Sequence, residues 1–274
     1  MPQNDRDYLS PSEVRNKELD ILRAFDKLCA EHNLRYVLIY GTLLGALRHG
    51  GFIPWDDDID VCMPREDYER LYKLWKTNPQ IFTYNLISAR DKTFPNSWFK
   101  LVDPDTIAYL DYYDNSIPHG LWIDIFPYDS TEVLNVKVRI IFLLLKPLAF
   151  LVSVANMNPT AGNSRSRILI KKLLIPLKKS LNPFKLSAKM DYLAKKINTI
   201  GGSRVFFQVL GASCRKPINR SDIFPVSRVS FENHTFPAPS NPDKVLTVVY
   251  GNWRKLPPEE QRIRHATKVK YVNS

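Results

Sequence analysis

The chain has 274 residues, of which 39 are Lys or Arg and 28 are Asp or Glu, so its formal net charge is +11. This length suits one large domain or two small ones, and 44% hydrophobic with 24% charged residues excludes a wholly disordered chain. Its cysteines, Cys29, Cys62 and Cys214, are widely spaced, which excludes zinc ribbons and disulfide scaffolds. The polar start, residues 1–7, lacks the pattern of a signal peptide, so we expect a reducing, cytoplasmic location.

The first half of the chain alternates between helical and extended patterns. Ser10 to Glu13 reads as a capping box, and apolar residues at helical spacing predict a helix over residues 11–32. We predict a strand over 35–40, a short helix over 43–47, a strand over 59–63 and a helix over 64–77. Further strands are expected near 82–87, 97–102, 106–110 and 121–126.

After Ser130 the pattern changes to long helices that extend to about Ile200, and the last third is Pro-rich and less regular. The fold class we expect is therefore α+β: a mixed sheet with flanking helices and a helical addition in the second half. The predicted divisions are a catalytic core over 1–130, a basic helical region over 131–235 and a C-terminal segment over 236–274 that returns to the active site.

Positive charge is concentrated in this helical region. Residues 133–190 contain no Asp or Glu. Their eleven basic residues are Lys137, Arg139, Lys146, Arg165, Arg167, Lys171, Lys172, Lys178, Lys179, Lys185 and Lys189. Interleaved Leu and Ile make a basic amphipathic surface, which favours an anionic membrane or, alternatively, an ordinary solvated helical face. No nucleic-acid-binding signature accompanies the charge, so we expect no nucleic-acid partner.

The longest apolar run is Ile140–Ala155, which is interrupted by Lys146-Pro147. It is shorter than the roughly 20 residues that a spanning helix needs. A membrane-spanning helix is possible but not favoured. We expect peripheral contact with the inner face of the membrane instead.

A cluster of carboxylates carries the clearest chemical signal. Asp58 and Asp60 lie two residues apart at the start of a predicted strand, so both side chains point to one face of the sheet. Two carboxylates this close repel each other unless a cation lies between them. Oxygen ligands favour Mg²⁺ or Mn²⁺, which would neutralise phosphate charge.

Two further features fit a phosphate-handling site. Gly41 and Thr42 stand where a strand turns into a helix, and the free N–H groups of such a turn bind phosphate. Asp124 is a lone carboxylate within the apolar strand pattern of residues 121–127, where an unpaired charge would be costly. It could complete the metal site or act as a general base toward an acceptor hydroxyl.

Other interpretations of the acid run remain open. A solvated turn would also be rich in Asp. A calcium-binding EF-hand loop is disfavoured because Val61 stands where the loop needs Gly. A DxD-type sugar-nucleotide glycosyltransferase and a non-catalytic membrane-surface protein both remain alternatives.

The segment GTLLGALRHGGFIPWDDDIDVCMPREDY, residues 41–68, resembles the signature of the LicD family of phosphocholine transferases. Two later blocks, SWFK at residues 97–100 and WIDIFPYD at residues 122–129, also resemble family blocks. A C-terminal block with Tyr250-Gly251, Arg262 and His265 does so as well. The resemblance covers residues 36–265 in family order, with a divergent middle from about 131 to 235.

This resemblance implies a nucleotidyltransferase-like fold and a set of roles. Asp58, Asp60 and Asp124 would form the catalytic metal site. The residues implied in donor binding are Gly41, Thr42, Arg48, Trp55 and Lys100. Tyr109, Tyr112, Tyr113, Trp98 and Trp253 could form an aromatic cage for a quaternary ammonium group.

The implied reaction is metal-dependent transfer of phosphocholine, or a similar phospho-alcohol, from a CDP-activated donor such as CDP-choline. The acceptor would be a sugar hydroxyl of a cell-surface polysaccharide, teichoic-acid or lipopolysaccharide precursor, free or linked to a lipid.

Overall fold

The structure is a computed structural model that describes residues 8–56, 58–110, 119–131, 136–159, 169, 171–198, 205–208, 210, 216–262 and 267–272. Several residues singled out from the sequence lie outside these ranges: Asp57, Tyr112, Tyr113, Arg165, Arg167, Cys214 and His265.

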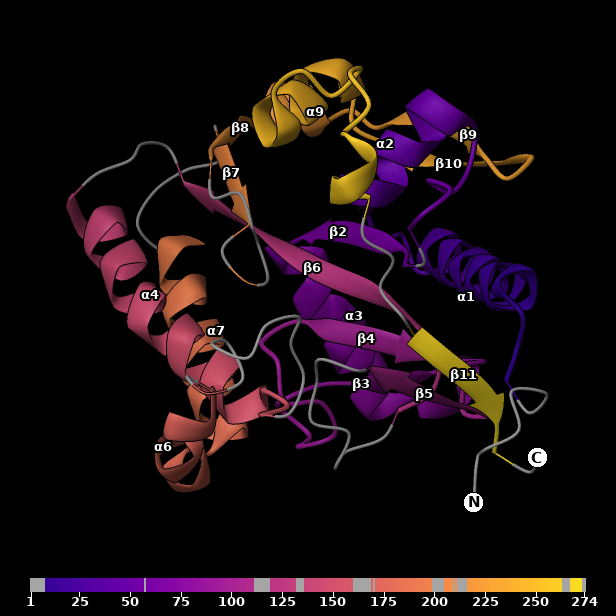
Figure 1. The fold of residues 1–274 in the computed structure, drawn as a ribbon. Helices are drawn as coiled ribbons and strands as arrows, with labels where there is room; N and C mark the ends of the chain where they lie inside the picture. The colour runs from indigo at the N-terminus through magenta and orange to yellow at the C-terminus, as the bar shows by residue number, and fades with distance from the viewer. Residues whose placement is uncertain are drawn as a thin grey trace.

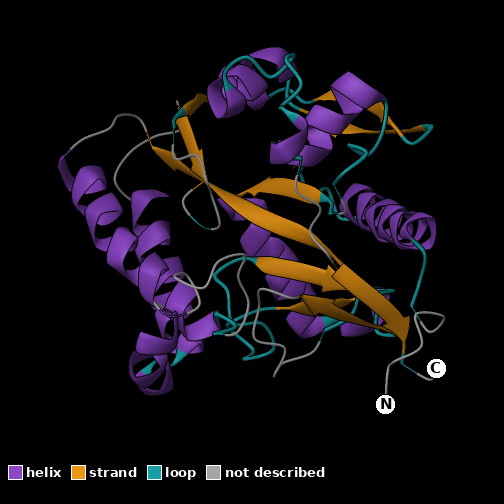
Figure 2. Cartoon of the chain, in the orientation of Figure 1, coloured by secondary structure: helices purple, strands orange, loops and turns teal. Residues whose placement is uncertain are grey.

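Helices and strands alternate through the first half of the chain (Figures 1 and 2). The elements in order are α1 Pro11–Glu31, β1 Val37–Leu38, α2 Tyr40–His49, β2 Asp60–Pro64, α3 Arg65–Thr77, the 3-10 helix Pro79–Ile81, β3 Asn85–Ile87, β4 Phe99–Val102, β5 Thr106–Leu110 and β6 Trp122–Thr131. Ser10 caps α1 with the predicted capping box, since its side chain accepts from the backbone of Glu13.

The second half begins with helices and then returns to strands. Its elements are α4 Val136–Asn156, α6 Ile175–Ser180, α7 Pro183–Asn198, β7 Val205–Gln208, β8 Ile218–Asn219, α8 Arg220–Ile223, β9 Ser227–Phe231, β10 His234–Ala238, α9 Pro242–Tyr250, the 3-10 helix Glu259–Gln261 and β11 Thr267–Tyr271.

Strand β6 organises the main sheet. Within the described residues the sheet has seven strands, in the order β1-β2-β6-β4-β3, with β7 joined to β6 and β8 joined to β7. β2 runs parallel to β6, whereas β4 and β7 run antiparallel to it. The mixed sheet and its helices are consistent with the expected α+β class.

The two faces of β6 serve different purposes because its side chains alternate between them. On the face of Ile125, helix α3 packs Tyr68 and Tyr72 against Phe99 of β4, with ring centroids 3.9 and 5.4 Å apart. Figure 1 shows α3 behind the sheet accordingly. The opposite face carries Asp124 and is the face of the candidate site.

Two predictions on the early elements need correction. The strand expected over 35–40 is only Val37–Leu38, and the helix expected over 43–47 begins at Tyr40 and ends at His49. Tyr40 has a φ of 47°, so the extended backbone ends there and the chain turns at once into α2. Apolar side chains continue through this turn, and therefore the pattern does not show where the strand ends.

The last third is more regular than predicted. β9 and β10 form a hairpin whose two turn residues, Glu232 and Asn233, both have positive φ values, 49° and 60°. Such primed turns usually contain Gly, and a Glu-Asn turn is a weak sequence signal. β11 pairs with β5, which brings the end of the chain back to the first half.

Helices α4 and α7 form a separate small core beside the sheet. Ile141, Leu145 and Val152 of α4 pack with Met190 and Ala194 of α7. In Figure 1, α7 lies between α4 and β6, so α4 forms the outer flank of the molecule. The predicted helical addition is confirmed in outline, while the divisions at 130 and 235 stay predictions.

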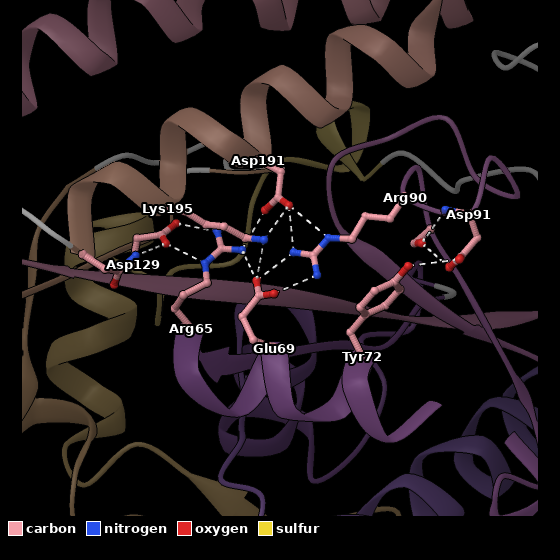
Figure 3. Close-up of polar contacts among 10 residues, drawn as sticks. Arg65, Glu69, Tyr72, Arg90, Asp91, Asp129, Asp191 and Lys195 are labelled. Atoms are coloured by element: carbon pink, nitrogen blue, oxygen red, sulfur yellow. Dashed lines mark hydrogen bonds and ion pairs between the residues drawn. The ribbon is translucent and has the colours of Figure 1, made fainter. Parts of the chain in front are cut away.

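A buried ion-pair network joins α7 to the sheet (Figure 3). It consists of Arg65, Glu69, Arg90, Asp129, Asp191 and Lys195. Arg65 Nε and Nη2 donate to the two oxygens of Asp129 at 2.7 and 2.9 Å, and its Nη1 reaches Asp191 Oδ1 at 2.8 Å. Bidentate pairs of this kind fix orientation, so α7 is held in a defined position against the sheet.

Candidate functional site

Three charged residues lie directly opposite one another on neighbouring strands at the centre of the sheet. Asp60 of β2 is in register with Asp124 of β6, which is in register with Lys100 of β4. Residues directly opposite each other on neighbouring strands share a face. The register therefore brings together three residues that are distant in the sequence.

Asp58, which directly precedes β2, completes an acid triad with Asp60 and Asp124. One carboxylate oxygen from each residue lies within 4.8 Å of the others. Desolvation raises the pKa of Asp60 well above its ordinary value, and the carboxylates of Asp58 and Asp124 add to the shift. Carboxyl groups this close together disfavour one another's ionisation. A hard divalent cation such as Mg²⁺ or Mn²⁺, which prefers oxygen ligands, would offset their negative charge.

Asp124 is fixed by donors on both of its oxygens. Oδ1 accepts from Trp98 Nε1 at 2.5 Å, and Oδ2 accepts from Trp122 Nε1 at 2.9 Å. Lys100 Nζ lies 3.2 and 3.3 Å from the two oxygens. Hydrogen bonds to both oxygens hold the carboxylate in one orientation, which suits a metal ligand better than a base that must swing toward a proton.

Lys100 is buried on β4, next to Asp124 of the triad. Its ammonium lies 3.6 Å from the centre of the Trp122 ring. Burial lowers the pKa of Lys100, and Asp124 opposes that shift. The sequence assigned Lys100 to donor phosphate. The structure places it against Asp124, where it supplies positive charge to the triad, and direct phosphate contact stays a prediction.

The loop between α2 and β2 is anchored from outside. Arg15 of α1 donates from Nη2 to the carbonyl oxygens of Ile53, Pro54 and Asp56, at 3.4, 2.9 and 3.3 Å. From the other side, the Glu232 carboxylate accepts from the backbone N–H of Phe52 at 2.9 Å. The loop that carries the acid run is thereby tied to α1 and to the β9–β10 hairpin.

Gly41 and Thr42 lie in the first turn of α2, where the helix presents N–H groups with no partner inside the helix. A Cβ atom on Gly41 would collide with the carboxylate of Asp56, so glycine allows that carboxylate to approach the helix end. The Thr42 hydroxyl accepts from the backbone N–H of Asp60 at 2.8 Å. Thr42 thus fixes the position of β2, and a phosphate contact of either residue stays a prediction.

A basic and aromatic group lies beside the acid run. The Arg48 guanidinium donates to the Trp253 carbonyl oxygen at 3.0 Å. Desolvation lowers the pKa of Arg48, and Arg262 adds to that shift, so the two cations are neighbours. Arg262 also lies over the Trp55 ring, 4.9 Å from its centre. Two adjacent arginines beside carboxylates suit the binding of a diphosphate. The diphosphate would contact the arginines on one side and a cation held by the carboxylates on the other.

Tyr250, at the end of α9, faces the triad. Burial raises the pKa of its hydroxyl, and the charges of Asp60 and Asp56 contribute further. Tyr250 is thus close enough to the acid run to feel its charges, while the division of the chain at residue 236 stays a prediction.

Three features of the site were not predicted from the sequence: the contacts of Arg15, the contacts of Trp122 and the position of Tyr250 near the triad. Trp122 could have been found, because a residue two positions before Asp124 on a strand points to the same face. Arg15 gives no such signal, since its contact spans about forty residues and depends on the packing of α1.

The structure describes only some residues of the aromatic cage that we predicted for a quaternary ammonium group. Trp98 donates to Asp124, whereas Trp253 Nε1 donates to Asp243 at 3.1 Å, so each indole N–H already serves a carboxylate. Tyr109 lies on β5, and Tyr112 and Tyr113 fall outside the described residues. A choline cage from these residues stays a prediction.

Comparisons with known proteins decide the family. Over 268 residues the chain is 30% identical to the lipopolysaccharide cholinephosphotransferase LicD of Haemophilus influenzae, and the match covers 93% of this chain and 95% of that protein. Residues 33–142 match the family described as LicD/FKTN/FKRP, nucleotidyltransferase domain. The chain belongs to the LicD family. This confirms the resemblance seen in the sequence and makes the protein a LicD-like phosphotransferase.

Shorter matches cover parts of two uncharacterized proteins. An uncharacterized protein of Rickettsia prowazekii (strain Madrid E) is 31% identical over 108 residues, which covers 29% of this chain and 40% of that protein. An uncharacterized protein of Rickettsia typhi is 43% identical over 47 residues, covering 17% of this chain and 15% of that one. The matched family domain, residues 33–142, contains all three triad carboxylates and Lys100.

Proposed function

We propose that this LicD-family protein transfers phosphocholine, or a closely related phospho-alcohol, from a CDP-activated donor to a sugar hydroxyl of a cell-surface glycan precursor. The observation that carries the proposal is the acid triad, in which Asp58 and Asp60 are half-buried and Asp124 is buried. The name of the Haemophilus influenzae relative supports the choline phosphate group and a lipopolysaccharide acceptor. The family description supports a nucleotidyltransferase-like arrangement of the core.

In this proposal, Asp58, Asp60 and Asp124 hold one or two Mg²⁺ or Mn²⁺ ions. A divalent ion bound there would neutralise the charge of the diphosphate. Lys100 and the two tryptophan N–H groups keep Asp124 oriented as a ligand. Because the donors on Asp124 are fixed, its role is that of a ligand rather than a general base.

Arg48 and Arg262 bind the diphosphate of the donor from the side of the C-terminal segment. The oxygen of the acceptor hydroxyl forms a bond to the phosphorus that bears the alcohol and releases its proton to solvent, while the bond from that phosphorus to the bridging oxygen breaks and CMP leaves with that oxygen. Trp55 holds the Arg262 guanidinium over its ring by cation–π attraction, which keeps this arginine beside the acid run. The Asp56 carboxylate lies next to the first turn of α2, so it limits how closely a phosphate can approach the N–H groups there.

We further propose that the enzyme works in the cytoplasm at the inner face of the membrane. That leaflet carries anionic lipids, which suit a region as basic as residues 133–190. A lipid-linked glycan precursor would meet the enzyme at the same surface.

A donor screen tests the proposed function. Purified protein is incubated with CDP-choline, other CDP-alcohols and UDP-sugars, with a glycan acceptor and Mg²⁺, and nucleotide release is measured. Release of CMP that requires the metal and disappears in Asp60→Asn supports the proposal. Metal-dependent release of UDP from a UDP-sugar would instead identify a glycosyltransferase. Absence of turnover with every donor would contradict an enzymatic role.

A further inference from the structure

Helix α4 is apolar on both of its sides, although protein covers only one. Its inner side packs on α7, as described above. On its outer side Val136, Leu143 and Phe150 are 71%, 66% and 56% exposed. A helix on the surface of a soluble protein carries polar residues on its outer side. The outer side of α4 therefore has the composition of a face that something apolar covers.

The exposed residues form one continuous stripe along α4. Its large apolar members, which we name the α4 stripe, are Val136, Ile140, Leu143, Leu144 and Phe150. Leu143 and Leu144 lie three and four residues after Ile140, which itself lies four after Val136, and Phe150 lies seven after Leu143, so all five lie on one helical face. Basic residues lie beside this stripe and are exposed: Lys137, Arg139 and Lys146. An apolar stripe with cations at its margins is typical of a helix that lies in a membrane interface.

The segment around α6 repeats this pattern next to α4. Leu169, Leu173 and Leu177 are 61%, 73% and 36% exposed, at a spacing of four residues. Exposed Lys172 and Lys179 are interleaved with them. The segment is fastened to the end of α4, because the Lys178 ammonium donates to the carbonyl oxygen of Met157 at 2.8 Å.

The charge of this region points to the chemistry of its partner. Between residues 136 and 198 the sequence contains a single acid, Asp191, and it is engaged in the ion-pair network. The exposed charges described in this stretch are therefore all positive. An acidic surface with an apolar interior complements this face, and an anionic lipid bilayer has both properties.

We propose that the α4 stripe and the exposed leucines around α6 dock the enzyme on an anionic membrane, with α4 lying in the plane of the interface. Helix α4 is also long and apolar enough to cross a bilayer, and 33% of its most apolar window is buried within the protein. Two contacts argue against crossing. One side of α4 packs on α7, and Asn156 Nδ2 donates to Asn96 Oδ1 at 3.2 Å. A spanning helix would lose both.

The cations on α4 give a further reason for docking in the interface. If α4 crossed a bilayer, Lys146 in its middle would lie near the centre, where a charged side chain is costly, whereas at an anionic surface Lys137, Arg139 and Lys146 are all attracted. Burying the stripe adds apolar attraction that salt does not screen. Docking should therefore depend on both lipid charge and apolar contact.

Vesicle co-sedimentation of the full chain tests this proposal. Wild-type protein should pellet with phosphatidylglycerol vesicles at low salt, and 1 M NaCl should weaken the binding by shortening the Debye length to about 3 Å. Binding to neutral phosphatidylcholine vesicles should be much weaker. Extraction with alkaline carbonate should release the protein from the vesicles, since a peripheral enzyme has no spanning segment.

Matched variants separate the stripe from the rest of the surface. Leu143→Ser with Phe150→Ser should reduce the partition coefficient by about tenfold or more, because two large apolar side chains lose their contact with lipid. Ile81→Ser with Leu256→Ser removes exposed apolar residues elsewhere and should leave binding unchanged. Both variants should keep the wild-type melting temperature and the wild-type rate with water-soluble substrates.

Charge variants form the second arm. Lys137→Gln with Lys146→Gln should weaken binding about tenfold at low salt, whereas Lys27→Gln with Lys255→Gln should have little effect. Equal loss in both charge variants would overturn the proposal in favour of nonspecific attraction.

Three other outcomes would also overturn docking in the interface. One is binding that resists carbonate, which would show that α4 crosses the bilayer. Another is a dimer in solution that Leu143→Ser with Phe150→Ser dissociates, which would assign the stripe to a second copy. The third is absence of binding to either vesicle. None of these outcomes depends on the donor specificity, so docking can fail while the proposed reaction stands.

Discussion

Among the residues that the structure describes, two clusters of carboxylates share strand β6 and behave in opposite ways. In the ion-pair network, Asp129, Asp191 and Glu69 meet Arg65, Arg90 and Lys195, three acids with three bases (Figure 3). In the acid triad, Asp58, Asp60 and Asp124 lie together, and Lys100 is the basic residue that bonds Asp124.

The pKa values follow this difference. Burial alone would raise the pKa of Asp191, but Arg65 and Arg90 lower it below its ordinary value. At the triad, desolvation and neighbouring carboxylates act in the same direction and raise the pKa of Asp60. A cluster balanced by its own cations stabilises the fold, while a cluster rich in acid suits a cation that arrives with substrate or solvent.

Alternation along one strand separates the two clusters. Asp124 and Asp129 are five positions apart on β6, so they point to opposite faces of the sheet. The face of Asp129 binds α3 and α7 and holds the helical region. The face of Asp124 is left for chemistry. Substitutions on the two faces should therefore separate activity from stability.

The largest effect is expected at the triad. Asp58→Asn, Asp60→Asn and Asp124→Asn should each lower turnover at least about 1,000-fold, because loss of a metal ligand removes several kcal/mol of transition-state stabilisation. Without added metal, Asp58→Asn and Asp60→Asn should keep or raise the melting temperature, since one mutually repelling carboxylate is removed. Asp124→Asn should lower the melting temperature, because it leaves the buried Lys100 without its charged partner. Steady-state CMP release and thermal unfolding provide the two readouts.

Asp56→Asn is the control for these variants, since Asp56 lies outside the triad and its effect should be milder. Full loss of activity in Asp56→Asn together with normal turnover in Asp124→Asn would mean that the triad is wrongly composed.

The opposite result is expected at the network. Asp129→Asn leaves Arg65 without its bidentate partner in a buried position and should lower the free energy of unfolding by about 3–5 kcal/mol. Turnover per folded molecule should change little at temperatures below the transition. Denaturant unfolding gives the stability.

Lys76→Gln, at an exposed ion pair with Asp91, is the matched control and should cost about 1 kcal/mol or less. If Asp129→Asn unfolded no more easily than this control, the network would not be a structural clamp.

Acid should weaken the network before the rest of the fold. The pKa values of Asp191 and Glu69 are lowered in the folded protein, from ordinary values of 3.8 and 4.5. Their stabilisation is complete above those ordinary values and is lost as the pH falls through the lower folded values. The protection factors of α7 amides, which correct for the pH dependence of intrinsic exchange, should therefore fall below about pH 4. Protection factors in α7 that are the same at pH 3.5 as at pH 6 would argue against this coupling.

The smallest effect is expected at the loop anchor. Arg15→Gln removes hydrogen bonds to the carbonyl oxygens of Pro54 and Asp56 and should lower kcat about three- to tenfold, as each charged hydrogen bond contributes about 1.5–3 kcal/mol to the local order. Arg15→Lys should restore part of the rate. Arg23→Gln, elsewhere on α1, serves as the control, and an equal loss there would point to a general effect on α1.

The sequence predicted the grouping of the three carboxylates better than the turns around them. Asp58, Asp60 and Asp124 could be grouped because alternation and the cost of buried charge act locally. The pairing of Lys100 opposite Asp124 depends on strand register, which no local sequence pattern specifies. The early start of α2 at Tyr40 and the Glu232-Asn233 hairpin were missed because both rest on positive φ values at residues other than glycine.

The ion-pair network was missed for a related reason. Its members come from α3, the loop after β3, β6 and α7, over about 130 residues of sequence. Charged residues on helices are usually exposed, so only the packing of α7 on the sheet reveals that Asp191 is buried. The α4 stripe, by contrast, follows from composition once one side of the helix is known to be covered.

Direct measurement of Mn²⁺ binding tests the central claim, that the triad is a divalent-cation site and the network is not. Electron paramagnetic resonance of Mn²⁺ titrated into wild-type protein, Asp60→Asn and Glu69→Gln counts bound ions without any turnover. We predict saturable binding by wild type and Glu69→Gln, competition by Mg²⁺, and loss of that binding in Asp60→Asn. Equal binding by Asp60→Asn and wild type would contradict the account.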